Sequence, residues 1–460
     1  MSAEKNDNAP PRSPLGRLIN LVAPVEEREI PAVVAAFCLF FCVFAGYFAV
    51  RPVRETVGTI LGKQRTADLF LVTLAAAIAV IPIYGALVAK FRRSLFLPWM
   101  YGGTALALVI VSLVLRENPD SVLTAQFFYV FISVLNLFLV SVFWSFLLEL
   151  FQSGQVKRLF GIIAAGGTTG ALVGPALTDL MVKKVGNTGI LFFSASMFLL
   201  AIVFQRVLIG IWKRQPAVEP ATVAATASTS SGGHVRGDRP IGGNPFAGLI
   251  QVLTTPYLLA IALFVFLLAS VSTFLYFEQL GLVQKLFSDP ADRTRVFARL
   301  DWIVQSLTVI CQIFLTGRIA ARFGLTTLLV VVPIAVVFGF LALAATGTFM
   351  VLAIVFIGRR VGEYAFVRPA REMLFSKLDN ETRYKAKNVV DVPVYRLADA
   401  ATAQLQKWME HSGMTPATTA IIGACVAAAW AINAFLLGRR NDASEKADIA
   451  GKAALESRGH

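Results

Sequence analysis

The chain has 460 residues, of which 56% are hydrophobic and only 15% are charged, and its mean hydropathy is +0.68. Soluble domains carry about 25% charged residues, so this composition excludes an ordinary soluble protein and indicates an integral membrane protein. The formal net charge of +14 does not require a nucleic-acid partner, because membrane proteins concentrate Lys and Arg in their cytoplasmic loops. The sequence contains no nucleic-acid-binding motif, and we expect no such partner.

Twelve apolar runs follow one another along the chain, in two sets of six. A helix that crosses a bilayer needs roughly 20 residues, and the runs are close to or above this length. We therefore predict an all-α integral membrane protein with twelve transmembrane helices in two six-helix bundles. The runs lie at 30–50, 66–89, 95–115, 121–148, 159–182, 189–211, 257–284, 299–316, 324–346, 348–367, 388–406 and 416–438.

Polar segments divide the chain into five predicted parts. The first residues are polar and contain prolines but no apolar core, so we expect a tail and not a cleavable signal peptide. The segment from Ala221 to Gly233 is a low-complexity stretch that cannot build a core. We expect a tail at 1–29, a bundle at 30–212, a flexible linker at 213–255, a second bundle at 256–438 and a tail at 439–460. Two-bundle secondary transporters have this layout.

The positions of Lys and Arg predict the orientation. Most of them fall between the runs on the side that holds both termini and the linker, and this side is cytoplasmic by the positive-inside rule. We expect a multi-pass protein of the inner (cytoplasmic) membrane with both termini in the cytoplasm. The first and seventh runs end in basic outer segments, and we interpret part of that charge as facing a substrate.

Cysteine and histidine give no sign of a disulfide framework or a metal site. All four cysteines lie inside apolar runs, where they are expected to pack as small hydrophobic side chains. The three histidines lie in loops or tails without the spacing of metal ligands. No nucleophile–base constellation is visible either, so we expect no metal, no cofactor and no enzyme activity. The residues concerned are Cys38, Cys42, Cys311, Cys425, His234, His411 and His460.

A stripe of glycines marks the fifth run. Gly166, Gly170 and Gly174 are spaced four residues apart, which places them on one face of a helix and predicts close packing against another helix. A phosphate-binding loop is the alternative, but no strand precedes the glycines and no Gly-Lys-Ser follows them. We therefore favour helix packing.

The motif Arg-Pro-x-Arg-Glu occurs once in each half of the chain. The first copy is Arg51-Pro-Val-Arg54-Glu55 and the second is Arg368-Pro-Ala-Arg371-Glu372. Each copy could simply mark a helix end, with proline in a turn and arginines reaching lipid headgroups. Alternatively, the arginines bind phosphate or carboxylate oxygens in pairs. We favour binding because the motif is repeated, although the topology places the copies toward opposite sides of the membrane.

Ionisable residues inside predicted spans are further candidates, because burying charge in a membrane is costly. The spacing of Arg359 with Glu363, and of Arg396 with Asp399, predicts two ion pairs with a structural role. Glu278 has no opposite charge within one turn, so we favour a site residue over a gate salt bridge. The predicted substrate-binding residues are Arg51, Arg54, Glu55, Glu278, Arg368, Arg371 and Glu372, and the candidates for gating or coupling are Asp301, Asp391, Arg396 and Asp399.

Over about residues 30–438 the chain resembles the plastid and intracellular-bacterial nucleotide transporters, the ATP/ADP translocases, which are major facilitator-like. The segment from Arg368 through Lys385-Ala-Lys387 to Asp391 is similar to the family's Asp-Pro-Cys-Lys-Glu-Met, Lys-Gly-Lys and Asp. The first copy is similar to the family's Arg-x-x-Lys-Asp. The resemblance implies a major facilitator fold and exchange of nucleoside triphosphate for diphosphate.

By this resemblance, Arg54, Glu278 and Arg371 fall where the family carries charged residues tied to nucleotide transport. Two departures stand out. Arginine replaces the family's lysine at Arg54 and Arg371, and a planar fork is not equivalent to a point charge. The family's fourth-helix glutamate has no counterpart near Asn136 and Leu137. These departures indicate a divergent bacterial branch whose substrate can differ.

We predict a secondary transporter that moves nucleotides, by exchange and alternating access. The alternatives are a proton-coupled facilitator for another organic anion or a drug, and a non-transporting membrane sensor or assembly factor. The expected partners are a nucleotide or other anionic solute and the lipid bilayer. The oligomeric state stays open, and the pattern is compatible with a monomer.

Overall fold

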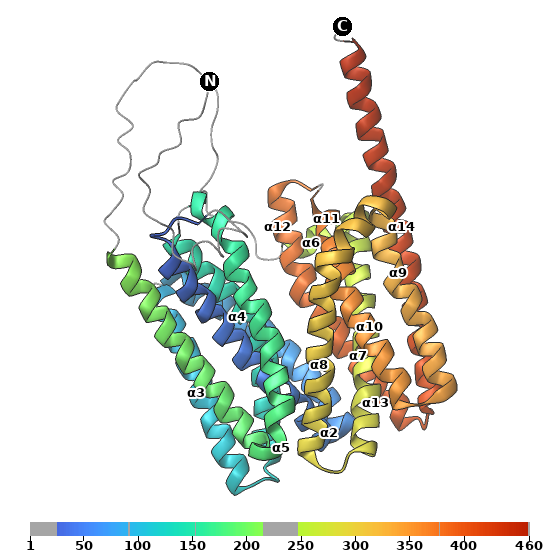
Figure 1. Ribbon diagram of the computed structural model, residues 1–460. Helices are drawn as coiled ribbons and strands as arrows, with labels where there is room; N and C mark the ends of the chain where they lie inside the picture. The colour runs from blue at the N-terminus through green and yellow to red at the C-terminus, as the bar shows by residue number, and fades with distance from the viewer. Residues whose placement is uncertain (1–24, 91–92, 152, 215–246, 377, 459–460) are drawn as a thin grey trace. The chain divides into compact units, whose positions relative to one another are not determined.

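The computed structural model describes residues 25–90, 93–151, 153–214, 247–376 and 378–458 (Figure 1). Every regular element within these ranges is helical. Most of the predicted tail at 1–29 and of the predicted linker at 213–255 lies outside the described residues.

The helices follow each other with short connections within each described range. In chain order they are α2 (Ile30–Lys90), α3 (Arg93–Glu117), α4 (Val122–Leu150), α5 (Ser153–Arg214), α6 (Ala247–Thr254), α7 (Pro256–Leu286), α8 (Pro290–Cys311), α9 (Gly317–Thr346), α10 (Phe349–Gly362), α11 (Arg368–Phe375), α12 (Asn380–Val389), α13 (Tyr395–His411) and α14 (Pro416–Arg458). Three π-helical turns join neighbouring helices: η1 (Gln312–Thr316), η2 (Glu363–Val367) and η3 (Val390–Val394).

Three of the long helices are broken by a kink. The breaks lie at Gly62 in α2, Gly186 in α5 and Gly324 in α9, where the backbone leaves helical geometry with a positive φ. Each break falls at a predicted junction between apolar runs. A residue without a Cβ adopts this conformation readily, so the chain reverses there with hardly any loop.

The predicted spans are all found among the described residues. Seven helical stretches are long and apolar enough to cross a membrane, and three of these contain the kinks. The runs at 348–367 and 388–406 correspond to α10–η2–α11 and α12–η3–α13, which carry more charge. Counting both sides of each kink turns the seven stretches into ten, and these two runs bring the helical segments of the described residues to twelve. The predicted all-α fold is therefore confirmed.

Two element boundaries differ from the predicted runs. Helix α8 begins at Pro290, well before the predicted start at 299, because Asp289 caps it by accepting a hydrogen bond from the Ala291 backbone N–H and proline occupies its first turn. Helix α14 continues from the last span to Arg458, through the segment predicted as a polar tail.

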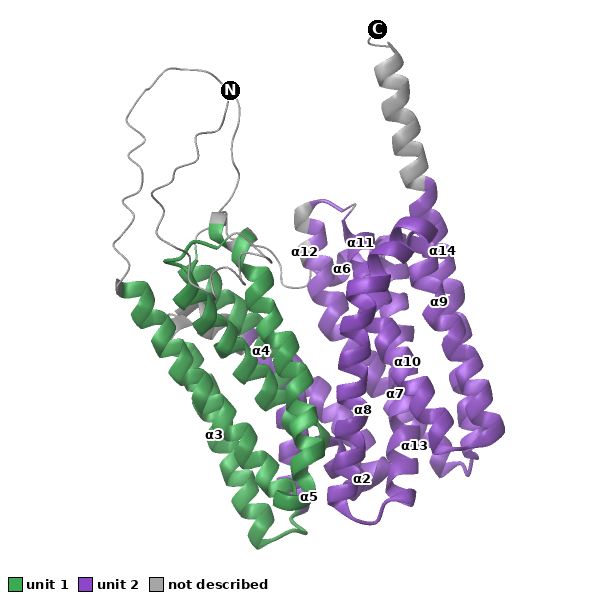
Figure 2. Cartoon of the chain, in the orientation of Figure 1, with its two compact units in different colours: residues 1–53, 83–121, 135–225 green, residues 54–82, 122–134, 226–460 purple. Residues whose placement is uncertain are grey.

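The chain divides into two compact units (Figure 2). Unit 1 contains residues 1–53, 83–121 and 135–225, and unit 2 contains residues 54–82, 122–134 and 226–460. Unit 2 therefore combines the second half of the chain with two segments from the first half, one from α2 and one from the start of α4.

The glycine stripe of α5 packs against α2 within unit 1, as predicted. A Cβ at Gly166 or at Gly170 would lie 2.4 Å from the carbonyl oxygen of Phe37 or Phe41 respectively, and one at Gly174 would lie 2.6 Å from that of Ala45. Only glycine permits this approach. Two hydroxyls extend the contact, because Thr178 donates to the Ala49 carbonyl at 3.1 Å and Ser194 to the Gly46 carbonyl at 2.7 Å.

The core of unit 2 is built from α7, α9, α13 and α14. Helix α14 packs against α9 and α7, and α13 packs against α7. Large aromatic side chains fill the space between them: the rings of Phe264 and Trp430 meet edge to face at 5.8 Å, and those of Phe274 and Phe340 at 6.5 Å. This apolar packing fixes the helices that carry the charged residues described next.

Candidate functional site

The first Arg-Pro-x-Arg-Glu copy lies in α2, where the chain passes from residue 53 of unit 1 to residue 54 of unit 2. Arg54 forms an ion pair with the neighbouring Glu55 and donates a hydrogen bond from Nη1 to the Ser133 hydroxyl at 3.1 Å. Ser133, on α4, in turn donates to the Tyr129 carbonyl at 2.7 Å. The Arg54 side chain is 16% exposed and that of Glu55 is 9% exposed, so unit 2 holds this pair largely away from solvent.

A second arginine from the far end of the sequence reaches the same serine. Arg396 on α13 donates from Nη2 to the Ser133 carbonyl at 3.4 Å, and its Nη1 pairs with Asp399 at 3.3 Å. Asp399 also accepts a hydrogen bond from the Thr273 hydroxyl on α7 at 2.8 Å. The predicted Arg396–Asp399 pair is therefore confirmed, and it lies in the same cluster as Arg54.

Two tyrosines support this cluster. The Arg54 guanidinium lies 5.3 Å from the centre of the Tyr129 ring, within cation–π range. The Tyr129 and Tyr276 hydroxyls are hydrogen-bonded at 2.8 Å, which ties α4 to α7. We call Arg54, Glu55, Ser133, Arg396 and Asp399 the Ser133 cluster.

The second motif copy belongs to a separate set of ion pairs on the elements from α10 to η3. Glu363 accepts from Arg359 at 2.9 Å, which confirms that predicted pair, and also from Arg368 at 3.2 Å. Arg371 pairs with Asp391 at 3.0 Å, and Glu372 pairs with Lys387 at 2.5 Å.

Exposure differs along this second set of ion pairs. The Arg368 side chain is 52% exposed and that of Arg371 only 14%. The Arg368 guanidinium also lies 4.4 Å from the centre of the Tyr364 ring. Arg368 is therefore the more accessible of the two arginines, while Arg371 is held inside by the Asp391 carboxylate from η3.

Asp301 lies in the middle of α8 and pairs with Arg360 on α10. Both side chains are almost fully buried, and the Arg360 guanidinium also lies 5.7 Å from the centre of the Tyr364 ring. This pair joins two membrane-spanning helices of unit 2. A buried pair of this kind needs both partners, because either charge alone would be stranded in an apolar environment.

Glu278 is buried on α7, with 6% of the residue exposed. A Cβ at Gly281 would lie 2.5 Å from Cε and 2.8 Å from Nζ of Lys63, so the Lys63 side chain lies directly over α7 at that glycine. Residues three apart share a helix face, which places Lys63 beside Glu278. The charged groups that act on Glu278 are Lys63, Lys285 and Glu410.

Arg51, also predicted to bind substrate, lies in unit 1. It is half-buried, and its guanidinium lies 6.0 Å from the centre of the Phe48 ring. The unit boundary thus passes through the first motif copy between Arg51 and Arg54.

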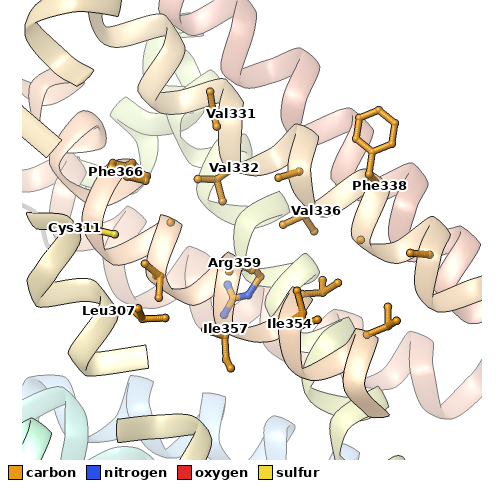
Figure 3. A pocket seen from close by; sticks show the side chains of 18 residues that line it. Leu307, Cys311, Val331, Val332, Val336, Phe338, Ile354, Ile357, Arg359 and Phe366 are labelled. Carbon is orange, nitrogen blue, oxygen red and sulfur yellow. The ribbon is translucent and has the colours of Figure 1, made fainter. Parts of the chain in front are cut away.

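A groove of about 680 Å³ opens between α8, α9 and α10. Its lining is almost entirely apolar, with Arg359 the one charged side chain among the lining residues (Figure 3). The Arg359 guanidinium is held by Glu363. The groove is therefore separate in character from the charged clusters, and it does not resemble a site for a multiply charged anion.

The sequence patterns did not indicate several residues of these clusters. Ser133 and Tyr129 are single polar residues in an apolar run, and Lys63 is one of several basic residues in the outer segment after the first run. Tyr129 and Ser133 are four residues apart, and this spacing places both on one face of a helix. Their meeting with Arg396 and Tyr276 depends on contacts between segments far apart in the sequence, which periodicity does not reveal.

The chain is similar to curated carriers over nearly its whole length. It is 22% identical over 511 aligned positions to ADP,ATP carrier protein 1 of Chlamydia trachomatis, covering 96% of this chain and 95% of that carrier. It is 21% identical over 467 positions to ADP,ATP carrier protein 1 of Chlamydia muridarum, covering 88% and 87%. The predicted resemblance to this group is confirmed.

Solved structures show the same fold at low identity. The nucleoside transporter NupG superposes with a TM-score of 0.59 at 14% identity, covering 90% of this chain and 99% of NupG. The peptide transporter PepTSo superposes with a TM-score of 0.59 at 13% identity, covering 91% of this chain and 99% of PepTSo. A bacterial homologue of ferroportin superposes with a TM-score of 0.57 at 13% identity, covering 88% and 98%. At these identities the likeness shows the fold alone.

The family model described as Major Facilitator Superfamily matches residues 36–369, well over half of the chain. This match agrees with the helical architecture and with the solved structures of the same fold. The apolar helices make the protein a multi-pass integral membrane protein, and its relatives are membrane transporters. The chain belongs to the Major Facilitator Superfamily.

Proposed function

We propose that this transporter exchanges nucleotides of the ATP/ADP type across the bilayer by alternating access. The observation that carries the proposal is the similarity to two ADP,ATP carrier proteins, which extends over 96% and 88% of this chain. A second support comes from the residues themselves. Arg54 and Arg371 each lie in a partly buried cluster with carboxylates, and paired arginine forks suit the oxygens of a phosphate chain.

The ion pairs suggest how binding would proceed. Glu55 neutralises Arg54, and Asp391 neutralises Arg371. A nucleotide phosphate would replace each carboxylate as the partner of its arginine, so that one charge-assisted interaction is exchanged for another. Because the substrate changes the pairing that holds the helices, its binding energy can shift the balance between conformations.

The remaining predicted residues have proposed roles in the same cycle. Arg51, Glu278, Arg368 and Glu372 would contribute further charge along the substrate path. Asp301, Asp391, Arg396 and Asp399 would connect substrate binding to helix movement through the pairs described above.

The proposed topology follows the distribution of basic residues. Residues 30–212 and 256–438 would act as the two bundles of the alternating-access cycle. Both termini and the linker at 213–255 would face the cytoplasm, with the protein in the inner membrane.

Counter-flow in proteoliposomes tests the function. Vesicles that contain the purified full-length protein are loaded with unlabelled ATP, and labelled ADP is added outside. We expect uptake into loaded vesicles and little into empty ones. Arg371→Gln should lower this uptake roughly tenfold or more, because it removes charge-assisted bonds to phosphate.

Arg116→Gln is the matched control, since Arg116 lies in the last turn of α3 and is exposed. It should leave uptake unchanged. Uptake into empty vesicles that follows an imposed proton gradient would instead support a proton-coupled anion facilitator. No flux of any nucleotide by correctly folded protein would show that the proposed function is wrong.

A further inference from the structure

The Ser133 cluster brings together two arginines that are far apart in the sequence. Arg54 donates to the Ser133 hydroxyl at 3.1 Å, and Arg396 donates to the carbonyl oxygen of the same residue at 3.4 Å. The two side chains are 16% and 17% exposed. Their guanidinium groups therefore converge on one residue from α2 and α13.

This convergence has an electrostatic cost. Like charges repel strongly where the effective dielectric constant is low. Glu55 and Asp399 offset the repulsion by pairing with Arg54 and Arg396 respectively, and Thr273 holds Asp399 in place at 2.8 Å. The cluster is thus a neutral set of two cations and two anions.

Stability alone is a weak explanation for such a set. Buried ion pairs often contribute no more to stability than well-packed apolar side chains of similar volume. Two convergent guanidinium forks do, however, suit a group with several anionic oxygens. Both guanidinium groups already donate to oxygen atoms of one residue, the hydroxyl and the carbonyl of Ser133.

The surroundings of Arg54 limit its movement. Its guanidinium lies 5.3 Å from the centre of the Tyr129 ring, and the Tyr129 hydroxyl is hydrogen-bonded to that of Tyr276 at 2.8 Å. A side chain that is already oriented loses less conformational freedom when it binds a ligand.

We propose that Arg54 and Arg396 form a two-arginine subsite for the phosphate chain of the substrate, with Arg396 as a direct contact residue. The inference rests on the proposed function, because it assumes a substrate that contains linked phosphate groups. Asp399 competes with the phosphate for Arg396, and Glu55 competes for Arg54.

Equilibrium binding to the purified full-length protein tests the subsite, with ATP and inorganic pyrophosphate as probes in titration calorimetry. Arg396→Gln should weaken binding of both probes roughly ten- to a hundredfold. Arg396→Lys should recover part of the loss, because it restores the charge but not the fork. Arg116→Gln should bind both probes like the wild type.

Asp399→Asn provides a test with the opposite sign. If the carboxylate competes with phosphate, its removal should tighten pyrophosphate binding and enlarge the thermal stabilisation that pyrophosphate gives. This variant also keeps the test decisive if Arg396→Gln does not fold. Weaker binding in Asp399→Asn would overturn the competition and the subsite with it.

The outcomes separate the inference from the proposed function. If the wild type binds ATP and Arg396→Gln binds it equally well, the subsite is wrong while nucleotide transport stands. If the folded wild type binds neither ATP nor pyrophosphate, the proposed function fails and the subsite fails with it.

Discussion

Buried arginines in unit 2 are each held by carboxylates, and these pairs determine what a single substitution does. Asp301 and Arg360 are an enclosed example that joins two helices, with side chains 7% and 3% exposed. Removing one partner of such a pair leaves an uncompensated buried charge, whereas replacing both with apolar residues can be nearly neutral. Comparing the stability of the single and the double variant therefore shows whether the two charges serve mainly to neutralise each other.

We predict that Asp301→Asn lowers the stability of the protein by about 3–5 kcal/mol, because Arg360 then lacks its counter-charge. The double variant Asp301→Leu with Arg360→Met should recover most of this loss. Thermal unfolding of the purified protein in detergent measures both. If the double variant is as unstable as the single one, mutual neutralisation is not the main role of the pair.

A second prediction concerns the glycine stripe of α5. Gly170→Ala should destabilise the protein by about 1–3 kcal/mol, since overpacking forces the backbone apart and the new Cβ would lie 2.4 Å from the Phe41 carbonyl oxygen. Gly161→Ala on the same helix is the control, because nothing lies within 4 Å of its Cβ position. Equal melting temperatures for the two variants would contradict the close packing.

The sequence predicted the local pairs but not the distant ones. Arg359 with Glu363 and Arg396 with Asp399 follow from helix periodicity. The pairing of Asp301 with Arg360 joins separate helices, so it depends on how those helices pack. The same reason explains why Ser133 was not identified as the residue where Arg54 and Arg396 meet.

At the scale of elements, glycine kinks allow consecutive spans to follow each other with hardly any loop. Gly324 has φ 74° and ψ 179°, a conformation that is essentially restricted to glycine. It lies where the predicted runs at 299–316 and 324–346 meet. A side chain at this position would be strained even though space is available.

We predict that Gly324→Ala costs about 1–3 kcal/mol of stability through backbone strain. Gly317→Ala is the matched control on the same helix, because Gly317 has a helical φ of −65° and nothing lies within 4 Å of its Cβ position. Chemical unfolding in detergent measures both variants. A Gly324→Ala protein as stable as the control would show that the kink is not restricted to glycine.

Apolar runs predicted the existence and order of the spans well, and their ends less well. Length and hydropathy determine whether a segment can cross a bilayer, and they identified the twelve segments. Helix ends depend on capping and on neighbouring contacts. Helix α8 therefore begins at the Asp289 cap and not at the first apolar residue, and α14 extends beyond its span.

At the scale of the whole molecule, unit 2 combines the second half of the chain with residues 54–82 and 122–134. Several contacts hold these segments in place. Lys407 on α13 pairs with Asp68 at 2.6 Å, and Gln404 donates to the Ala67 carbonyl at 3.0 Å. Thr56 and Thr294 are hydrogen-bonded at 2.6 Å. Alternating access requires some contacts between the two halves of the sequence to break during each cycle, and these are the candidates.

A cross-link between positions 68 and 407 tests this requirement. The Asp68 and Lys407 side chains are 51% and 37% exposed, and exposed ion pairs contribute little to stability, so replacing both with cysteine should not unfold the protein. In a background without Cys38, Cys42, Cys311 and Cys425, we expect a short, reducible thiol cross-linker to stop exchange in proteoliposomes and reduction to restore it. Each single-cysteine variant should be unaffected by the reagent. Full exchange by cross-linked protein would mean that α13 and the 54–82 segment stay together throughout the cycle, and that the contacts which open lie elsewhere.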